Sequence, residues 1–255
     1  MTQAWALLLA LLSGAPAESA PAPTQPPCPE PAPSLLFHSC WGRARAELLL
    51  FPEDTLPATT AAGRQLTITG AYTGRDRRAG DKPNPVGLFI HSESAINETL
   101  ARMDGVLVLS PDTLTLHHRA RVTLDGTPYD LREPTQRQRF TESARAAGLG
   151  VLQSHLLVVD GVSDVTDTEG APRFTRRILF TKDGAWGVYQ TKTALTLHDA
   201  TEAVLRAHAP EMALNLDMGS YDYCRLSIAG TIRNCGYRAL SDTDLLSNLL
   251  VLRLE

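Results

Sequence analysis

The amino-acid sequence predicts an α+β fold: a single sheet-dominated domain of mixed or antiparallel strands with a few short helices. Short apolar runs recur between turn residues along most of the chain, a pattern typical of strands. One longer segment, residues 199–208, has apolar residues at the three-to-four spacing of a helix. The chain has 255 residues, of which 43% are hydrophobic and 20% charged, and this is the composition of a globular domain.

The N-terminal segment is expected to lie outside this domain. Residues 1–17 have the features of a signal peptide, because the apolar run 4–12 is followed by a small-x-small cleavage triplet. The alternative, a buried helix of the domain, conflicts with the prolines that follow. Those prolines dominate residues 18–35 and predict an extended tether. The apolar run is far shorter than the roughly 20 residues that span a bilayer, so we expect a domain over 36–255 and no transmembrane segment in the mature chain.

Apolar or alternating runs bounded by turn residues predict the strands. Pro52 ends the first of them, Asp125-Gly126 closes a meander, and Lys182-Asp183-Gly184 connects a hairpin. A polar, mostly basic loop is expected over 75–85. The expected strands are, in chain order, 46–51, 65–71, 86–90, 106–109, 113–117, 120–124, 156–159, 177–181, 186–191, 212–216 and 247–252.

Two helices are expected among these strands. Residues 199–208 carry the apolar stripe, either Thr196 or Asp199 caps the start, and Pro210 ends the helix. Residues 141–147 form a shorter helix that a glycine ends.

The charge balance and the missing motifs exclude several functions. The chain has 24 Lys and Arg against 28 Asp and Glu, a net charge of −4, so the molecule as a whole does not attract nucleic acid or an anionic membrane. The sequence contains no HExxH, no GxSxG and no phosphate-binding glycine loop. We therefore assign no metal site and no cofactor, and expect no nucleic-acid partner; metal dependence and the oligomeric state stay open.

Four cysteines form two close pairs in the sequence. Cys28 lies near Cys40, and Cys224 lies near Cys235. An even number of cysteines in an exported chain indicates disulfides, and neighbour pairing is the simplest of the three connectivities. The competing interpretation is a zinc site, which lacks any CxxC spacing. We expect disulfides and a secreted or periplasmic location; without export the four thiols would be free.

Asp217 is the first candidate for chemistry. It follows the apolar run 213–216 and precedes a glycine turn, so its carboxylate is held rigidly at the end of a strand. The alternative is a carboxylate that caps a turn through backbone amides.

Two further clusters carry titratable groups. Gln153-Ser154-His155 precedes an apolar strand, and His155 is a candidate general base or phosphate ligand; alternatively, this histidine is half-buried and bonded to a carbonyl. One guanidinium of the pair Arg176-Arg177 is a candidate phosphate partner, but alternation along a strand sends the two side chains to opposite faces. The competing interpretation is an edge-strand pair that prevents aggregation.

Five stretches of the chain, read in order, resemble motifs of the phosphodiester glycosidase family. Residues 68–72 and 84–90 are similar to the family's Asn-Gly-Gly-like strand end and Pro-Val-Gly-Leu strand. Residues 153–161 resemble a Gln-Ser-Gly-Pro-like segment that runs into Asp-Gly, and residues 176–184 an arginine-led strand before a second Asp-Gly. The most distinctive stretch, Ala-Leu-Asn-Leu-Asp-Gly-Gly-Gly-Ser, resembles residues 213–220.

The resemblance implies a divergent member of this family, an exported hydrolase that cleaves a sugar from a phosphodiester-linked glycan. Its ligand would be a phosphorylated glycan or sugar phosphodiester. The resemblance implies Asp217 as a general acid/base or positioning carboxylate and Arg176 as the partner of the phosphate. A glycosidase needs two carboxylates, and Asp160 and Glu142 are candidates for the second. The expected substrate-binding residues are Thr69, Gln153, Ser154, His155, Gly219 and Ser220.

The chain departs from the family pattern at several of these positions. Met218 interrupts the glycine run, Thr69 replaces an asparagine, and His155-Leu156 replaces Gly-Pro. A side chain at Met218 crowds the approach of a phosphate to backbone amides. These departures favour an alternative, a catalytically inactive envelope protein that binds a phosphorylated glycan without cutting it. A purely structural role is a third hypothesis.

Overall fold

A computed structural model describes residues 27–59, 62–76, 80, 82–241 and 243–255. Within them the chain is built mainly from strands, with the two helices α1 (Pro134–Ala146) and α2 (Leu197–His208) and the short 3-10 helices η1 (Ser39–Trp41) and η2 (Gly219–Tyr221). Every described strand pair is antiparallel. The predicted α+β class is confirmed. The expected signal peptide and the first part of the tether lie outside the described residues.

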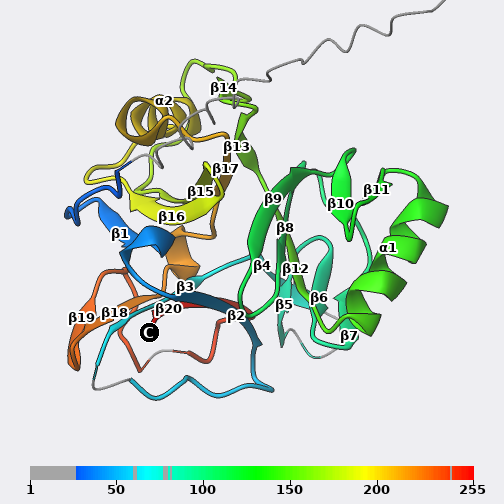
Figure 1. The fold of residues 1–255 in the computed structure, drawn as a ribbon, viewed down its shortest axis with the longest axis horizontal. Coiled ribbons are helices and arrows are strands. Elements are labelled where there is room, and N and C mark those ends of the chain that lie inside the picture. Colours follow the sequence, from blue (N-terminus) through cyan, green and yellow to red (C-terminus); the bar gives the residue numbers. More distant parts are fainter. Residues whose placement is uncertain (1–26, 60–61, 77–79, 81, 242) are drawn as a thin grey trace, which may run out of the picture.

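Three sheets make up the molecule (Figure 1). The strands of the first, in spatial order, are β1 (Leu35–His38), β16 (Ala185–Gln190), β15 (Arg177–Lys182), β17 (Met212–Asn215), β13 (Leu156–Val159) and β14 (Val162–Ser163). Those of the second are β19 (Thr231–Asn234), β18 (Cys224–Ile228), β3 (Arg64–Thr69), β20 (Asn248–Leu254) and β2 (Ala44–Leu50). Those of the third are β7 (Ser94–Asn97), β6 (Phe89–His91), β12 (Gly150–Ser154), β8 (Gly105–Leu109) and β9 (Leu114–His118). Two separate hairpins join β4 (Thr73–Asp76) to β5 (Lys82–Pro85) and β10 (Val122–Leu124) to β11 (Thr127–Tyr129).

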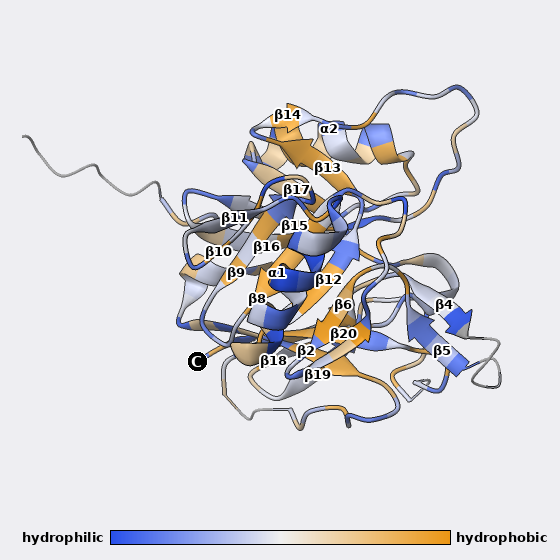
Figure 2. Cartoon of the chain, turned by 90° about the vertical axis from the view of Figure 1, so that its right-hand side faces the viewer, coloured by the Kyte–Doolittle hydropathy of each residue, from blue (hydrophilic) through white to orange (hydrophobic). Residues whose placement is uncertain are grey.

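Each sheet turns one apolar face to a common core. Leu179, Leu250 and Leu152, one from each of the three sheets, belong to the same buried cluster. The opposite faces are covered separately: α2 packs on the first sheet, α1 on the third, and the loops around residues 51–56 and 240–246 on the second. Figure 2 shows the apolar strands at the centre of the molecule and the polar outer surface of α1. Because side chains alternate between the two faces of a strand, each sheet contributes residues to the common core and to a second core on its outer face.

Most of the predicted elements are confirmed, with local corrections. The hairpin of β15 and β16 turns through Asp183 and Gly184, both with positive φ, as two-residue hairpin turns require. Thr196, not Asp199, caps α2, since its hydroxyl accepts a hydrogen bond from the Asp199 amide at 3.0 Å. The shorter helix begins seven residues earlier than expected, because Pro134 starts α1 at a position where a missing N–H costs nothing.

Two expectations about strands and loops were wrong, and one strand was missed. The expected basic loop 75–85 includes the end of β4 and all of β5. Gln153 and Ser154 precede β13 as expected, but they also end β12, which was not predicted. The strand expected at 86–90 starts only at Phe89, because Gly87 has a φ of +82° and a Cβ there would lie 2.4 Å from Gln153 Oε1. This close approach is possible only for glycine.

The first and second sheets are joined through a buried ion pair. Arg177 is fully buried, and its Nη1 donates to Asp222 Oδ1 at 2.9 Å. Its Nε and Nη2 donate to Gln190 Oε1 at 3.2 and 2.8 Å, and Nη2 also reaches the carbonyl of Cys235 at 3.5 Å. Residues 222 and 235 flank the hairpin of β18 and β19, so this guanidinium ties that hairpin to β15 and β16.

We predict that Arg177→Met lowers the free energy of unfolding by about 3–5 kcal/mol, because it leaves the Asp222 carboxylate buried without its counter-charge. Urea unfolding followed by circular dichroism measures the loss. The matched control is Arg173→Met, which removes an exposed pair with Asp199 and should cost less than about 1 kcal/mol. Adding Asp222→Asn to Arg177→Met should restore part of the stability; an equal loss for Arg173→Met and Arg177→Met would contradict the assignment.

Candidate active site

Three backbone segments from different sheets converge after β17. The amide of Asp217 donates to the carbonyl of Gly70 at 3.0 Å, the amide of Asn215 donates to the carbonyl of His155 at 2.9 Å, and the amide of Leu216 donates to the carbonyl of Arg177 at 2.9 Å. The turn after β3, the junction of β12 and β13, and the start of β15 therefore meet at one place. The polar side chains of these segments form the candidate site.

Asp217 is buried at the centre of this place, with 3% of its surface exposed. Its Oδ2 accepts a hydrogen bond from the amide of Thr73 at 2.9 Å. Burial raises the pKa of Asp217 to about 7, against the opposing effect of hydrogen bonds from Thr73 and Met218. A carboxyl group that is half-protonated near neutral pH is suited to proton transfer.

Asn215 lies two residues before Asp217 and is also buried. Its Nδ2 donates to the hydroxyl of Tyr72 and to the carbonyl of Leu216. Its Oδ1 is buried and has no hydrogen-bond partner among the described residues. Since an unpaired buried acceptor costs about 1–3 kcal/mol, this oxygen marks a point where a donor from a ligand would be favourable.

His155 and Tyr72 form the next part of the site. The two rings meet edge to face, with centroids 5.7 Å apart. Burial lowers the pKa of His155 and Arg176 lowers it further, whereas Asp104 acts in the opposite direction. The imidazole is therefore neutral at pH 7, and no described residue bonds to its ring nitrogens. Burial raises the pKa of the Tyr72 phenol, which stays protonated.

A pair of carboxyl groups, Asp104 and Asp164, lies near His155. Asp104 Oδ1 accepts a hydrogen bond from the amide of Leu156 at 3.0 Å. Burial, the charge of Asp104 and a hydrogen bond to Asp104 all raise the pKa of Asp164. Asp104 is thus a second carboxylate next to the site. The two carboxylates suggested by the sequence lie elsewhere: Asp160 is exposed and pairs with Arg121 at 3.0 Å, and the exposed Glu142 bonds to Gln138 on α1.

Arg176 and Arg177 occupy different surroundings, as strand alternation predicts. The Arg176 guanidinium lies over the ring of Phe174, 5.0 Å from its centroid. Its Nε and Nη2 donate to the carbonyls of Leu195 at 3.4 Å and Pro172 at 3.3 Å. Charge interactions connect Arg176 with Tyr72 and His155, so Arg176 borders the site while Arg177 serves the ion pair with Asp222.

Three of the expected substrate-binding residues use their side chains to hold the backbone. Gln153 accepts from the amides of Leu88 and Ala101 and donates to the carbonyls of Ala101 and Met103, which occupies both ends of its amide. Ser154 donates to the carbonyl of Asn215. Thr69 donates to the carbonyl of Tyr221 at 2.7 Å and accepts from the amide of Tyr223 at 2.9 Å. Each of the three positions the site without presenting a free polar group to it.

Gly219 and Ser220 lie on the surface, in η2. Gly219 has a φ of +75°, and a Cβ there would have no atom within 4 Å. The turn after Asp217 therefore uses a backbone conformation that favours glycine. Met218, which precedes it, is half-buried with extended backbone.

The sequence reasoning did not single out Tyr72, Asn215 or Asp104. Asn215 had a usable signal, because it lies two residues before Asp217 at the end of the same strand and so shares its face. Tyr72 lies at the end of the stretch 68–72 that resembles a family motif, but its contacts with His155 and Asn215 depend on the fold. Asp104 had no signal, since it reaches the site only because β8 pairs with β12.

Both predicted disulfides are present, Cys28–Cys40 and Cys224–Cys235. Disulfides are typical of proteins from oxidising compartments. Among the described residues, no helix combines the length and the hydropathy that crossing a membrane requires.

Comparison with known proteins gives similarity at the level of the fold. No family model matches the sequence, and no curated protein matches it. A hypothetical protein from Synechocystis, of known structure, is similar with a TM-score of 0.51 and 12% identity over 84% of this chain. The chain spans 57% of that protein's length. The zebrafish N-acetylglucosamine-1-phosphodiester alpha-N-acetylglucosaminidase catalytic domain, auto-inhibited by its pro-peptide, gives a TM-score of 0.48 at 9% identity, with 85% of this chain and 74% of that chain covered.

The raised pKa of Asp217 predicts a specific pH dependence of stability. The folded protein holds this proton up to about pH 7, while the unfolded chain releases it near the ordinary value of 3.8. Stability therefore falls as pH rises between these values, by about 2 kcal/mol from about pH 5 to about pH 7. Asp217→Asn should remove this part of the pH dependence.

Urea unfolding of both proteins at about pH 5 and about pH 8 tests this prediction. Subtracting the profile of the Asn variant removes the contribution of the histidines, which both proteins share. Parallel profiles for the two proteins would show that Asp217 is ionised at pH 5 in the folded state.

Proposed function

We propose that this chain is an exported hydrolase of the phosphodiester glycosidase type, which releases a sugar from a phosphodiester-linked glycan. The observation that carries the proposal is the carboxyl of Asp217, whose pKa is raised to about 7. Two residues before it, Asn215 Oδ1 is buried and has no hydrogen-bond partner among the described residues. Around the carboxyl, Tyr72 supplies a hydrogen-bond donor, His155 an acceptor and Arg176 a cation. The ordered motifs of the sequence support the same activity, and the two disulfides support export.

In this proposal Arg176 balances the charge of the phosphodiester. Asp217, protonated below about pH 7, donates a proton to the oxygen that leaves the sugar, and this is the role of the acid in glycosidases. His155 is neutral and takes a proton from the attacking water. Asp104 raises the pKa of His155 against the effect of burial, so it stabilises the imidazolium that forms.

The alternative is a protein that binds the phosphorylated glycan without cutting it. One observation favours it: the Arg176 guanidinium already donates to two carbonyls and lies over Phe174. In that case Asp217 serves to hold the segment after β17 against the start of β4 through its hydrogen bond from the Thr73 amide.

Sugar release from nucleotide sugars and from aryl phosphodiesters of sugars tests the proposal. We predict that Asp217→Asn and His155→Gln each lower kcat about 100-fold or more, because each removes one proton-transfer group. Asp160→Asn, an exposed carboxylate outside the site, is the matched control and should keep the parent rate. Thermal melting confirms that each variant is folded.

The outcomes separate the two functions. Release that is lost in Asp217→Asn supports the hydrolase. A ligand that raises the melting temperature of the parent without being cleaved supports the binding protein, since a ligand at 100 times its Kd stabilises by about 2.7 kcal/mol. Full activity of Asp217→Asn would remove this residue from the mechanism.

A further inference from the structure

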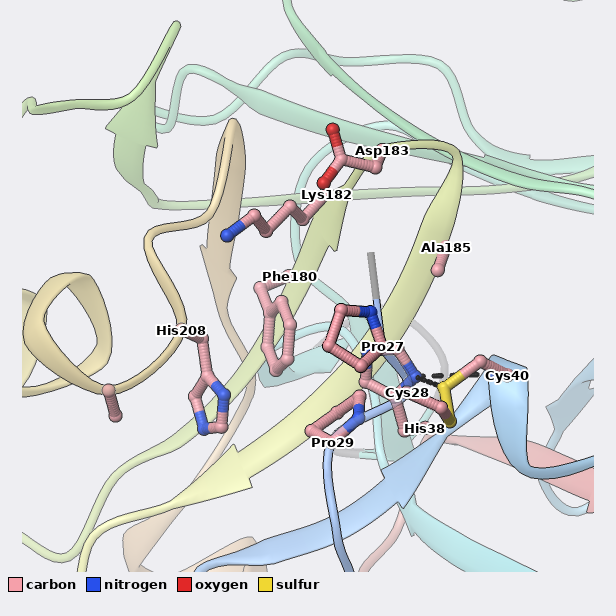
Figure 3. A pocket seen from close by; sticks show the side chains of 11 residues that line it. Pro27, Cys28, Pro29, His38, Cys40, Phe180, Lys182, Asp183, Ala185 and His208 are labelled. Atoms are coloured by element: carbon pink, nitrogen blue, oxygen red, sulfur yellow. Dashed lines mark hydrogen bonds between the residues drawn. A yellow bond between two sulfur atoms is a disulfide. The ribbon is translucent and has the colours of Figure 1, made fainter. Parts of the chain in front are cut away.

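A second cluster of reactive groups lies at the opposite end of β15 from Asp217. It surrounds the Cys28–Cys40 disulfide, whose two cysteines are exposed. The side chain of His38 lies against this disulfide, with Nδ1 2.7 Å from Cys40 Sγ. The three ligand atoms, Sγ of the two cysteines and a ring nitrogen of His38, all lie within 4.8 Å of one another. Figure 3 shows the imidazole beside the sulfur atoms.

His38 is oriented as a metal ligand must be. Its Nδ1 accepts a hydrogen bond from the amide of Cys40 at 3.3 Å, so this nitrogen carries a lone pair and no proton. The same lone pair faces the sulfur of Cys40. A neutral imidazole with an unprotonated nitrogen is the form that binds metals.

The ring of His38 is also fixed in place. Only 7% of the residue is exposed, and its ring packs against Phe180 and Trp41, with centroids 5.9 and 6.2 Å away. Gly187, its partner on β16, makes the room, because a Cβ there would lie 3.0 Å from His38 Cδ2 and 2.7 Å from Phe180 Cζ. A preorganised ligand lowers the entropic cost of binding.

The ligand atoms lie closer together than those of a tetrahedral zinc site, with 2.7 Å between His38 Nδ1 and Cys40 Sγ. Zn–S bonds of about 2.3 Å and Zn–N bonds of about 2.0 Å put the ligand atoms about 3.5–3.8 Å apart at tetrahedral angles. In the oxidised protein the two sulfur atoms are bonded to each other and cannot bind a metal. Reduction frees them to move apart to this distance.

A pocket of about 470 Å³ opens beside this cluster. His208 and Lys182 line it together with Phe180, and Pro27 and Pro29 flank the disulfide at its rim. The pocket gives a fourth ligand, water or a small molecule, access to a metal at this position.

We propose that Cys28, Cys40 and His38 form a redox-controlled site for a thiophilic metal ion of the zinc class. A dithiol reductant donates two electrons and two protons to the disulfide, which becomes two thiols, and is itself oxidised to a disulfide. The metal ion then displaces the two thiol protons and binds two thiolates and His38 Nδ1. It replaces the disulfide as the link that holds residues 27–29 against β1 and η1.

The second disulfide lacks these features and provides a control. Cys224 is fully buried, and within the described part of the chain no His, Asp or Glu completes a comparable ligand set around Cys224–Cys235. A protein with Cys224→Ser and Cys235→Ser should therefore keep the site, and one with Cys28→Ser and Cys40→Ser should lose it.

The test is metal binding by the full chain before and after reduction with a phosphine, which does not bind zinc strongly. Competition with a chromophoric chelator measures zinc affinity, and Co²⁺ reports thiolate ligands by its charge-transfer absorption. We expect one equivalent of metal with thiolate absorption in the reduced protein and none in the oxidised protein. His38→Asn keeps an acceptor for the Cys40 amide but removes the nitrogen ligand. Loss of a group that only orients a metal ligand weakens binding about 10- to 100-fold, so this variant should bind at least that much more weakly.

Two results would overturn the proposal: no metal binding by the reduced parent protein, or binding of equal strength by the Cys28→Ser, Cys40→Ser variant. Thermal melting of each variant shows whether it is folded. If the double variant unfolds, His38→Asn decides the question, and unchanged affinity in that variant excludes His38 as a ligand.

Discussion

The arrangement of this molecule depends on the guanidinium of Arg177, which is fully buried. A buried charge is stable only when a full set of hydrogen-bond acceptors surrounds it. Here the acceptors come from Asp222, Gln190 and backbone carbonyls on separate elements. The carbonyl of Arg177 also accepts from the amide of Leu216. The residue that joins two sheets therefore also fixes the strand end that carries Asp217.

The candidate site follows from this framework. Side chains such as Gln153 and Thr69 are fully engaged in hydrogen bonds to the backbone, and Ser154 joins β12 to β17 through the carbonyl of Asn215. Against this background of satisfied groups, Asn215 Oδ1 has no partner among the described residues, and Asp217 is a carboxyl with its pKa raised to about 7. Polar groups left in this condition inside a fold are candidates for a functional site.

The first sheet separates the two proposed sites. Asp217, His155 and Arg176 lie near the start of β15, and five residues later the strand ends near the Cys28–Cys40 disulfide. A strand of this length spans about 17 Å, so neither site perturbs the electrostatics of the other strongly. The N-terminal segment is tied to the second site through Cys28 and through Trp41, which donates to the carbonyl of Pro29 at 2.6 Å.

The sequence by itself determined the α+β class, most of the strands, the cap and end of α2, the disulfides, and the position of Asp217 at a strand end, because all of these depend on local periodicity, turn residues or short spacings. Only the tertiary structure decided which polar residues meet. Gln153 and Thr69 fit a binding motif in sequence, yet the backbone of neighbouring strands occupies them. Asp104 carried no local signal, and strand pairing brought it to His155. The hydrogen-bond partners of Gln153 and Thr69 lie far away in sequence, and local patterns contain no record of them.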